Sequence, residues 1–293
     1  MNRRFFQNNS DIDLMRNLLL SLVDTPSIID FEEFIQIQSV QQTTKLWFED
    51  TQLIAFAYVD NFNNLCFEIA TDIVKTDLEN EIADWGMDCM RSRNEQADDS
   101  NPLDTSCSAS NLSRISLLER MGFKQQEIRS LKFCRSLIDP IPFSPLPKGY
   151  TIKSVKGESE ITDLVKLHRS AFGTDHMTEE YRLAMMHAPD YDKTMDWVAI
   201  SPEGEPAAFC IGSIDETNPT LGFLDPIGTH PSHRRLGLSA ALISHGLTIL
   251  KNRGGKQVEF GTSSENLPMQ KLALHMGFSI KSESVWFSKE IKK

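Results

Sequence analysis

The sequence predicts an α/β fold made of two related domains in tandem. Three observations support this: the chain length, a proline-rich segment near the middle, and a succession of elements that occurs twice. The 293 residues are long for one compact core and sufficient for two domains of about 150 residues each. Hydrophobic residues make up 40% and charged residues 24%, as is usual for a globular protein.

The proline-rich segment gives the domain boundary. Residues 137–149 read LIDPIPFSPLPKG and contain four prolines. Proline has no N–H to donate and does not continue a helix or a central strand, so this segment is expected to be extended. The sequence therefore predicts an N-terminal domain over residues 1–138, a linker over 139–149 and a C-terminal domain over 150–293.

The repeated succession links the two halves. Asn111 precedes a helical stretch that ends 11 residues later at Gly122, and Asn266 precedes another that ends 11 residues later at Gly277. Each glycine is followed by phenylalanine. Upstream, the stretches that start near Lys45 and near Asp196 both contain two apolar runs around a turn signal, so both are predicted hairpins.

Periodicity predicts the elements of the second half in order. Strands are expected at 150–155, 222–229, 257–262 and 279–290, a hairpin at 197–214, and helices at 159–171, 236–252 and 267–276. Thr178 is expected to cap a further helix. Gly254 is expected to end the helix over 236–252.

The segment 225–241, DPIGTHPSHRRLGLSAA, contains the most informative motif. A strand ends at Thr229, and a loop of the form Arg234-x-x-Gly237-x-Ser239 then opens a helix. Such a unit directs backbone N–H groups and the positive end of the helix dipole at one point, which suits a pyrophosphate. Gly237 allows close approach of the backbone, and Arg234 and Arg235 add charged donors. The pattern is neither a Walker loop nor the dinucleotide-binding GxGxxG.

This pattern resembles the coenzyme-A loop of the GNAT acetyltransferase superfamily, Arg/Gln-x-x-Gly-x-Gly/Ala, with Ser239 in the last position. The preceding strand, the following helix, and Asn266 with Gly277-Phe278 match the superfamily in order and spacing. The resemblance covers about 140 residues of the second half well and the first half more weakly. The organisation in two domains resembles that of tandem GNAT proteins similar to mycothiol synthase. It implies that each domain has a mixed, mostly antiparallel central sheet flanked by helices.

The resemblance also implies an activity and a cofactor site. The implied activity is an acetyl-CoA-dependent N-acetyltransferase, in which the amine of a small molecule or peptide attacks the thioester directly. The pantetheine arm is expected to pair with Ile227, Gly228 and Thr229. The pyrophosphate is expected at the loop, over Arg234, Arg235, Leu236, Gly237, Leu238, Ser239 and Ala240. Asn266 is expected to hydrogen-bond the cofactor arm, and its other interpretation is an ordinary helix N-cap.

A general base is expected because a primary amine must lose a proton before it attacks. Asp225 is the candidate by position, with Glu259 and His230 as weaker candidates, and an ordinary polar residue at a strand end is the other interpretation of Asp225. The superfamily often has a tyrosine acid seven residues after the asparagine. Here that position is Ala273, so no acid is assigned.

The acceptor site is expected under the segment Phe172–Tyr191, where His176, Met177, Tyr181 and His187 could line it. Met and aromatic residues at helical spacing are also typical of a core. His168 and His275 are expected to be helix-surface or packing residues.

The first half has no corresponding loop. Its β-rich stretch is followed by TDIVKTDLENEIADWG, in which Asp72, Asp77 and Glu79 would repel a pyrophosphate. We therefore expect a degenerate copy of the second domain. The alternative for the whole chain is a catalytically inactive module that binds coenzyme A or a partner.

Composition limits the remaining possibilities. The net charge of −11 argues against general nucleic-acid binding. The five cysteines form no CxxC pair, which favours free thiols and no metal site. The N-terminus has no signal-peptide pattern and no apolar stretch long enough to span a bilayer, so a cytoplasmic protein without membrane contact is expected. A monomer and a homodimer are not distinguished.

Overall fold

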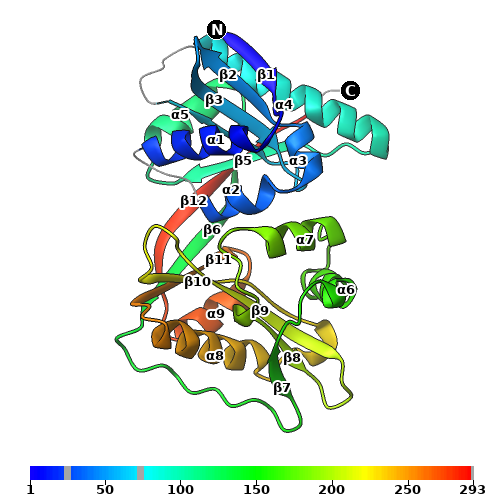
Figure 1. Ribbon diagram of the computed structural model, residues 1–293, viewed down its shortest axis with the longest axis vertical. Coiled ribbons are helices and arrows are strands. Elements are labelled where there is room, and N and C mark those ends of the chain that lie inside the picture. Colours follow the sequence, from blue (N-terminus) through cyan, green and yellow to red (C-terminus); the bar gives the residue numbers. More distant parts are fainter. Residues whose placement is uncertain (23–27, 71–75, 292–293) are drawn as a thin grey trace. The chain divides into compact units, whose positions relative to one another are not determined.

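The computed structural model describes residues 1–22, 28–70 and 76–291, and it divides the chain into two compact units (Figure 1). Unit 1 comprises Met1–Glu127 and Ser284–Lys293, and unit 2 comprises Ile128–Glu283. Both are α/β, and the parallel and antiparallel pairings described below confirm the predicted mixed, mostly antiparallel sheets. The division at the proline-rich segment, which follows the sequence repeat, stays a prediction.

Unit 1 has a four-stranded antiparallel sheet in the order β1–β2–β3–β4. Its strands are β1 (Asn2–Phe5), β2 (Lys45–Glu49), β3 (Gln52–Val59) and β4 (Leu65–Ile69). A fifth strand, β5 (Leu103–Ser108), pairs antiparallel with residues 284–289 of β12 (Ser279–Lys289). Its helices are α1 (Asn9–Ser21), α2 (Ile28–Phe34), α3 (Gln38–Gln42), α4 (Thr76–Ala97) and α5 (Leu112–Arg120). Seven of the eight residues of β3 are buried, which places this strand at the centre of the unit's core.

Unit 2 is built on one sheet, in the order β12–β6–β11–β10–β9–β8–β7. The strands are β6 (Lys124–Ser136), β7 (Thr151–Ser154), β8 (Asp196–Ile200), β9 (Pro206–Ile214), β10 (Leu221–Thr229) and β11 (Gln257–Ser263). β10 and β11 are parallel, whereas β11–β6, β10–β9, β9–β8 and β8–β7 are antiparallel. The helices are α6 (Ile161–Phe172), α7 (Glu179–His187), α8 (Leu238–Asn252) and α9 (Leu267–His275).

Apolar side chains on β8 and β9 point alternately to the two faces of the sheet of unit 2, and helices pack on both faces. Trp197 and Cys210 pack in the core cluster that contains α8, whereas their strand neighbours Val198 and Phe209 pack in a second cluster with α6. Successive side chains of a strand point to opposite faces, so α8 and α6 cover opposite sides of β8 and β9. The sheet is therefore covered on both faces at β8 and β9, and β9 is the strand beside β10.

The structure confirms most predicted element positions in unit 2. The Thr178 hydroxyl accepts the N–H of Tyr181 at 3.0 Å and caps α7, as predicted. α8 starts at Leu238, two residues later than predicted, because Gly237 stands before it with a left-handed φ of 87°. Gly254, just after the helix, also has a positive φ of 92°, as a helix stop requires. The closing segment is one strand, β12.

The sequence did not predict which strand lies beside β11. β6, which precedes the proline-rich segment, pairs with it over seven positions, from Gln257↔Ser136 to Ser263↔Ser130. Unit 2 thus includes a strand from the first half of the sequence, and residues 284–289 belong to unit 1.

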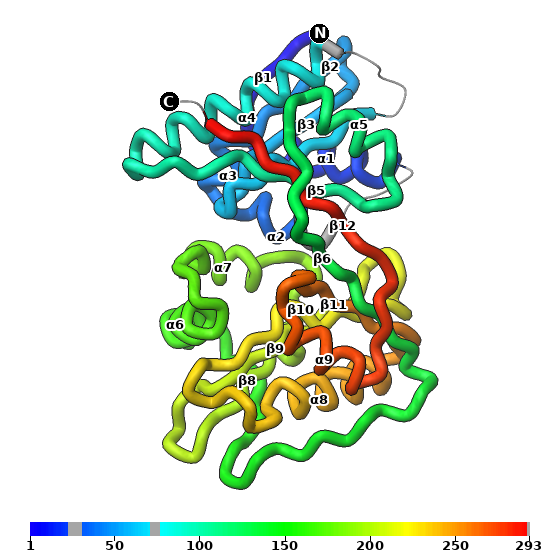
Figure 2. Tube along the Cα trace, turned by 180° about the vertical axis from the view of Figure 1, so that it is seen from behind, coloured from blue at the N-terminus to red at the C-terminus, as the bar shows by residue number. Residues whose placement is uncertain are grey.

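The proline-rich segment forms neither helix nor strand, as predicted, and runs as an extended strap past α9 and α8 (Figure 2). Ile141 and Leu146 pack against the core of unit 2, and the Arg135 guanidinium donates to the carbonyl of Pro140 at 3.1 Å. Among the helices in the described ranges, none is long and apolar enough to cross a membrane.

Candidate active site

β10 and β11 part inside the sheet of unit 2. They pair in parallel only from Leu221↔Gln257 to Phe223↔Glu259, although β10 continues to Thr229 and β11 to Ser263. On its other edge β10 pairs with β9 to its end, with a register shift between Leu224 and Ile227. The edge of β10 that faces β11 is therefore not covered by strand pairing along Ile227, Gly228 and Thr229, and its backbone groups are available to an added extended chain.

Asp225 lies where the two strands part. Its side chain is exposed, and Oδ2 accepts the N–H of Gly261 on β11 at 3.0 Å. A Cβ at Gly261 would lie 3.3 Å from this oxygen, so glycine permits the close approach. The carboxylate thus links β10 to β11 beyond their last paired residues, which gives Asp225 a structural role at the start of the opening.

The loop after β10 brings a helix N-terminus to the same end of the sheet. Gly237 is the N-cap of α8, no side chain caps this helix, and a Cβ at Gly237 would meet nothing within 4 Å. Arg235 also adopts a positive φ, of 66°. An uncapped N-terminus with open space in front of it suits an anion such as a pyrophosphate.

The side chains of the loop mostly hold it in place. The Arg234 guanidinium donates to the carbonyl of Ala171 at 2.8 Å and to that of Thr229 at 3.4 Å, which ties the loop to the last turn of α6. The hydroxyls of Ser239 and Thr229 are 2.7 Å apart. Leu238 is buried in the core, Ala240 packs against it, and Arg235 and Leu236 are exposed. Backbone N–H groups and Arg235 are therefore the donors that the loop offers to an anion.

Asn266 is the residue directly before α9, and Ala273 lies within this helix. The Asn266 side-chain oxygen accepts the N–H of Met269 at 3.2 Å, so the N-cap interpretation is confirmed, and the amide nitrogen is the group left to donate to a cofactor. Ala273 is fully buried in the core. Its methyl group has no ionisable proton that could be donated to a leaving thiolate.

The corresponding region of unit 1 is filled by its own side chains. Asn64, which directly precedes β4, forms a parallel bridge with Asp104 of β5. Beyond it, the Arg114 guanidinium lies 3.7 Å from the ring centroid of Phe67, donates to the Phe67 carbonyl at 2.5 Å, and stands 3.6 Å from Glu68. Asn111 caps α5 as Asn266 caps α9, so Met269 is the residue of unit 2 at the position of Arg114.

The acidic residues expected to repel a phosphate in unit 1 are only partly within the described ranges. Asp77 and Glu79 lie in the first turn of α4, where they occupy the positive end of the helix dipole. Asp72 lies outside the described residues.

The weaker base candidates have other interactions. The Glu259 carboxylate is buried and accepts hydrogen bonds from Lys281 at 2.5 Å and Gln257 at 3.0 Å. His230 caps a short 3-10 turn, its Nδ1 accepting the N–H of Ser232 at 3.3 Å. The hydrogen bonds of Glu259 and His230 therefore give both side chains a structural role.

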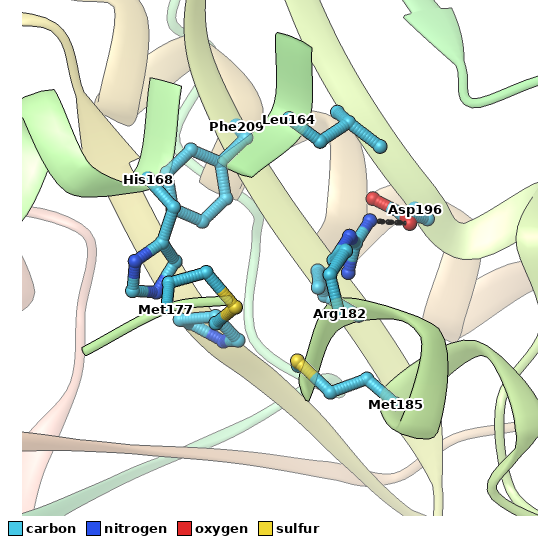
Figure 3. A pocket seen from close by; sticks show the side chains of 9 residues that line it. Leu164, His168, Met177, Arg182, Met185, Asp196 and Phe209 are labelled. Carbon is cyan, nitrogen blue, oxygen red and sulfur yellow. Dashed lines mark hydrogen bonds and ion pairs between the residues drawn. The ribbon is translucent and has the colours of Figure 1, made fainter. Parts of the chain in front are cut away.

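A small cavity lies between α6, α7 and strands β8 to β10 (Figure 3). Its volume is about 10 Å³, about the space that one water molecule needs. It is lined by Leu164, His168, Met177, Arg182, Met185, Asp196, Phe209, Ile211 and Pro226. Most of this lining is apolar, and the three polar side chains are all ionisable.

The polar residues of this cavity form a buried charged cluster. Arg182 on α7 and Asp196 at the start of β8 form an ion pair in which both side chains are almost completely buried. The Tyr191 hydroxyl donates to the same carboxylate oxygen, Oδ2, at 2.8 Å. Burial raises the pKa of Asp196 above its ordinary value, and burial together with the Asp196 charge raises that of Tyr191.

Two atoms of this cluster lack hydrogen bonds. Within the described ranges, neither Asp196 Oδ1 nor His168 Nδ1 has a partner, and both atoms are buried. Burial, with a contribution from the Arg182 charge, lowers the pKa of His168 to about 4, so the imidazole is neutral at pH 7. Its ring lies among Phe172 and Phe209, with centroid separations of 4.6 and 5.4 Å.

Sequence reasoning found only part of this cavity. Of the four residues expected to line the acceptor site, Met177 lines the cavity, Tyr181 is buried, and His176 and His187 are exposed. Arg182 and Asp196 were missed, and His168 was expected to be a helix-surface or packing residue. The available signal was the position of two charges within apolar surroundings: Arg182 beside Leu183 and Ala184, and Asp196 before the buried run Trp197–Ala199.

Comparisons with known proteins agree with this geometry. Residues 161–278 match the acetyltransferase (GNAT) family. Over 152 residues the chain is 26% identical to a mycothiol acetyltransferase of Salinispora arenicola, covering 50% of each protein, so it spans about half the length of this curated relative.

Two solved structures share the fold along the whole chain. A GCN5-related N-acetyltransferase from Sphaerobacter thermophilus is 18% identical with a TM-score of 0.71, covering 100% of this chain and 96% of its own. A tandem GNAT protein from the clavulanic acid biosynthesis pathway is 14% identical with a TM-score of 0.71, covering 100% and 99%. At these identities the likeness concerns the fold, which is that of tandem GNAT proteins.

Proposed function

Because residues 161–278 form a domain of the GNAT acetyltransferase family, we propose that the chain transfers the acetyl group of acetyl-CoA to an amine. The observation that carries the proposal is the opening between β10 and β11 beside the uncapped N-terminus of α8. An extended arm with amide groups can pair with the uncovered edge of β10, while its pyrophosphate lies at the helix N-terminus. One short segment of unit 2 thus offers both interactions.

The residues have distinct roles in this proposal. Ile227, Gly228 and Thr229 pair with the pantetheine arm, and a backbone N–H among them polarises the thioester carbonyl. One such donor typically contributes about 3 kcal/mol to transition-state stabilisation. The backbone of residues 234–240, with Arg235, binds the pyrophosphate, and the Asn266 amide nitrogen donates to the arm.

Proton transfer is assigned to Asp225. The attacking amine must be neutral, and this carboxylate stands at the start of the opening. Because Ala273 offers no acid, the leaving group departs as a thiolate, which a thiol pKa of about 8.5 permits at neutral pH. Buried Ala273 is also the observation that favours the second candidate function, a coenzyme-A-binding protein without turnover.

Unit 1 is assigned no cofactor. The Arg114 guanidinium donates to the carbonyl of Phe67, which would otherwise be available to an added chain. The Thr105 hydroxyl donates to the carbonyl of Leu65 at 2.8 Å. In unit 2, Met269 stands at the position of Arg114. We therefore expect one acetyl-CoA per chain.

The test is an acetyl-transfer assay on the full chain, with a panel of primary amines and detection of released coenzyme A. Gly237→Glu should abolish turnover, because it combines a left-handed φ with a negative charge at the phosphate site. Gly254→Glu is the matched control, since Gly254 has the same backbone conformation and open surroundings at the other end of α8. Turnover by Gly237→Glu at the rate of the control would contradict the site.

The variant Asp225→Asn distinguishes the proposed role of Asp225 as a general base from its structural role as the hydrogen-bond acceptor that links β10 to β11. The asparagine oxygen can still accept the N–H of Gly261, so acetyl-CoA affinity should persist while kcat falls by about 10²-fold or more. Unchanged kcat would remove Asp225 from proton transfer and leave its structural role.

A further inference from the structure

Lys132 on β6 lies one strand away from the opening between β10 and β11. It pairs directly with Gly261 of β11 in the antiparallel register. Its neighbours Leu131 and Phe133 are buried in the core that contains α8. Because successive side chains of a strand point to opposite faces, Lys132 points to the other face of the sheet, and its side chain is exposed.

Gly261 also connects Lys132 to Asp225. Directly opposed residues of an antiparallel pair point to the same face, with Cβ atoms about 4.5–5.5 Å apart. The Gly261 N–H donates to Asp225 Oδ2 at 3.0 Å, and a Cβ on Gly261 would lie 3.3 Å from that oxygen. The Cβ of Lys132 is therefore at most about 9 Å from the Asp225 carboxylate. Since the residue between them is glycine, no side chain separates the two.

The Lys132 amine is long and free enough to cover this distance. A lysine side chain spans about 5 Å from Cβ to Nζ and is flexible, so Nζ can come within about 4 Å of the Asp225 carboxylate. Within the described ranges, the Lys132 side chain takes part in no hydrogen bond or ion pair. Lys281 differs in this respect, because its amine donates to the buried carboxylate of Glu259 at 2.5 Å.

We propose that unit 2 acetylates its own Lys132, which makes this residue a self-modification site beside the opening. The inference rests on the proposed function, because the acetyl donor is the acetyl-CoA assigned to unit 2. The Lys132 Nζ lone pair attacks the thioester carbonyl carbon, a C–N bond forms, and the C–S bond breaks with release of the coenzyme-A thiolate. The proton that Nζ loses passes to the Asp225 carboxylate, and the product is an uncharged acetyl-lysine amide.

Proximity distinguishes this reaction from slow chemical acetylation of surface lysines. An amine held beside the thioester reacts as part of one molecule, which raises its effective concentration far above that of a free amine. The half-time of the modification should therefore be independent of the protein concentration. Acetylation also removes the positive charge of Lys132 from the neighbourhood of Asp225.

The experiment is incubation of the full chain with acetyl-CoA and no added amine, at about pH 8, where more of a lysine amine is neutral than at pH 7. A protease that does not cut at lysine then yields peptides in which mass spectrometry quantifies acetylation at each lysine. Lys132 should react at least tenfold faster than Lys166, whose side chain is 71% exposed on α6 and which measures the chemical background. Lys281, held by Glu259, should also stay near that background.

Two variants test the cause. Gly237→Glu, which places a negative charge at the proposed phosphate site, should lower the acetylation rate of Lys132 to that of Lys166, whereas the matched control Gly254→Glu should not. Lys132→Arg should remove the fast phase altogether, because a guanidinium stays protonated and does not attack the thioester.

The results separate this inference from the proposed function. Acetylation of Lys132 no faster than that of Lys166, or a rate that Gly237→Glu leaves unchanged, would overturn the inference. If the same protein still binds acetyl-CoA and acetylates an added amine, the proposed function stands without it. Absence of acetyl-CoA binding would instead contradict the proposed function, and the inference would fall with it.

Discussion

The buried ion pair between Arg182 and Asp196 gives the sharpest stability prediction. The two side chains are 6% and 1% exposed, so removing one partner leaves the other charge in a medium that solvates it poorly. Breaking a pair of this kind costs about 3–5 kcal/mol, whereas replacing both partners by neutral groups is often close to neutral. We therefore expect Arg182→Met to lower the free energy of unfolding by about 3–5 kcal/mol.

The double variant Arg182→Met/Asp196→Asn tests the cause. It removes both charges and keeps a side chain at position 196 that can accept the Tyr191 hydroxyl, so it should be more stable than Arg182→Met by about 2 kcal/mol or more.

Urea unfolding at pH 7, followed by fluorescence, measures both differences, since Trp197 directly follows Asp196 in the core. With a slope of about 2 kcal/mol per M urea, Arg182→Met should lower the midpoint by about 2 M. A loss below about 1 kcal/mol, or a double variant no more stable than the single one, would refute the assignment of a buried charge penalty.

Three further predictions follow from unit 2. The pKa of His168 falls from 6.5 to about 4 on folding, so the unfolded state binds more protons between these values. Stability should thus be fully present well above pH 6.5 and fall by about 3 kcal/mol towards pH 4, and urea midpoints across this range should show a smaller loss for His168→Phe. Gly228→Ala should destabilise by about 1–3 kcal/mol in thermal unfolding, because the new Cβ would lie 2.5 Å from Phe209 Cε1; a change below about 0.5 kcal/mol would contradict this packing. A fragment of residues 150–293 lacks β6 and leaves β11 without its antiparallel partner, so it should aggregate, whereas 128–283 should remain monodisperse in size-exclusion chromatography; the reverse order would contradict the pairing.

Local patterns predicted the elements and their order well. The apolar periodicity of α6 and the Thr178 cap are determined by neighbours within a few residues, whereas the left-handed Gly237 moves the start of α8 two residues beyond the predicted position. The loop and strand motif likewise indicated the opening beside the α8 N-terminus, because a strand, a glycine loop and a helix in direct succession allow few arrangements.

The pairing of distant strands could not be predicted in this way. β6 lies beside β11, and the last residues of β12 lie beside β5, yet neither strand carries a signal for its partner in its own sequence. When two halves are related, either copy of a strand satisfies the same hydrophobic alternation. The choice depends on packing over long sequence separations.

The charged cavity escaped prediction for a similar reason. His168 reads as a packing residue because its neighbours on α6 are apolar, and Arg182 and Asp196 lie 14 residues apart with nothing local to indicate a pair. Only the fold brings α6, α7 and β8 together. By contrast, Asn266 had two interpretations from sequence, and the structure confirms the cap while leaving its amide nitrogen for a ligand.

The central claim, that unit 2 binds acetyl-CoA and unit 1 does not, is tested most directly by isothermal titration calorimetry of the full chain with acetyl-CoA. We expect a single site with a Kd in the micromolar range, about −8 kcal/mol, lost in Gly237→Glu and retained in Gly254→Glu and Arg114→Met. Absence of binding, or binding that Gly237→Glu leaves unchanged, would contradict the account.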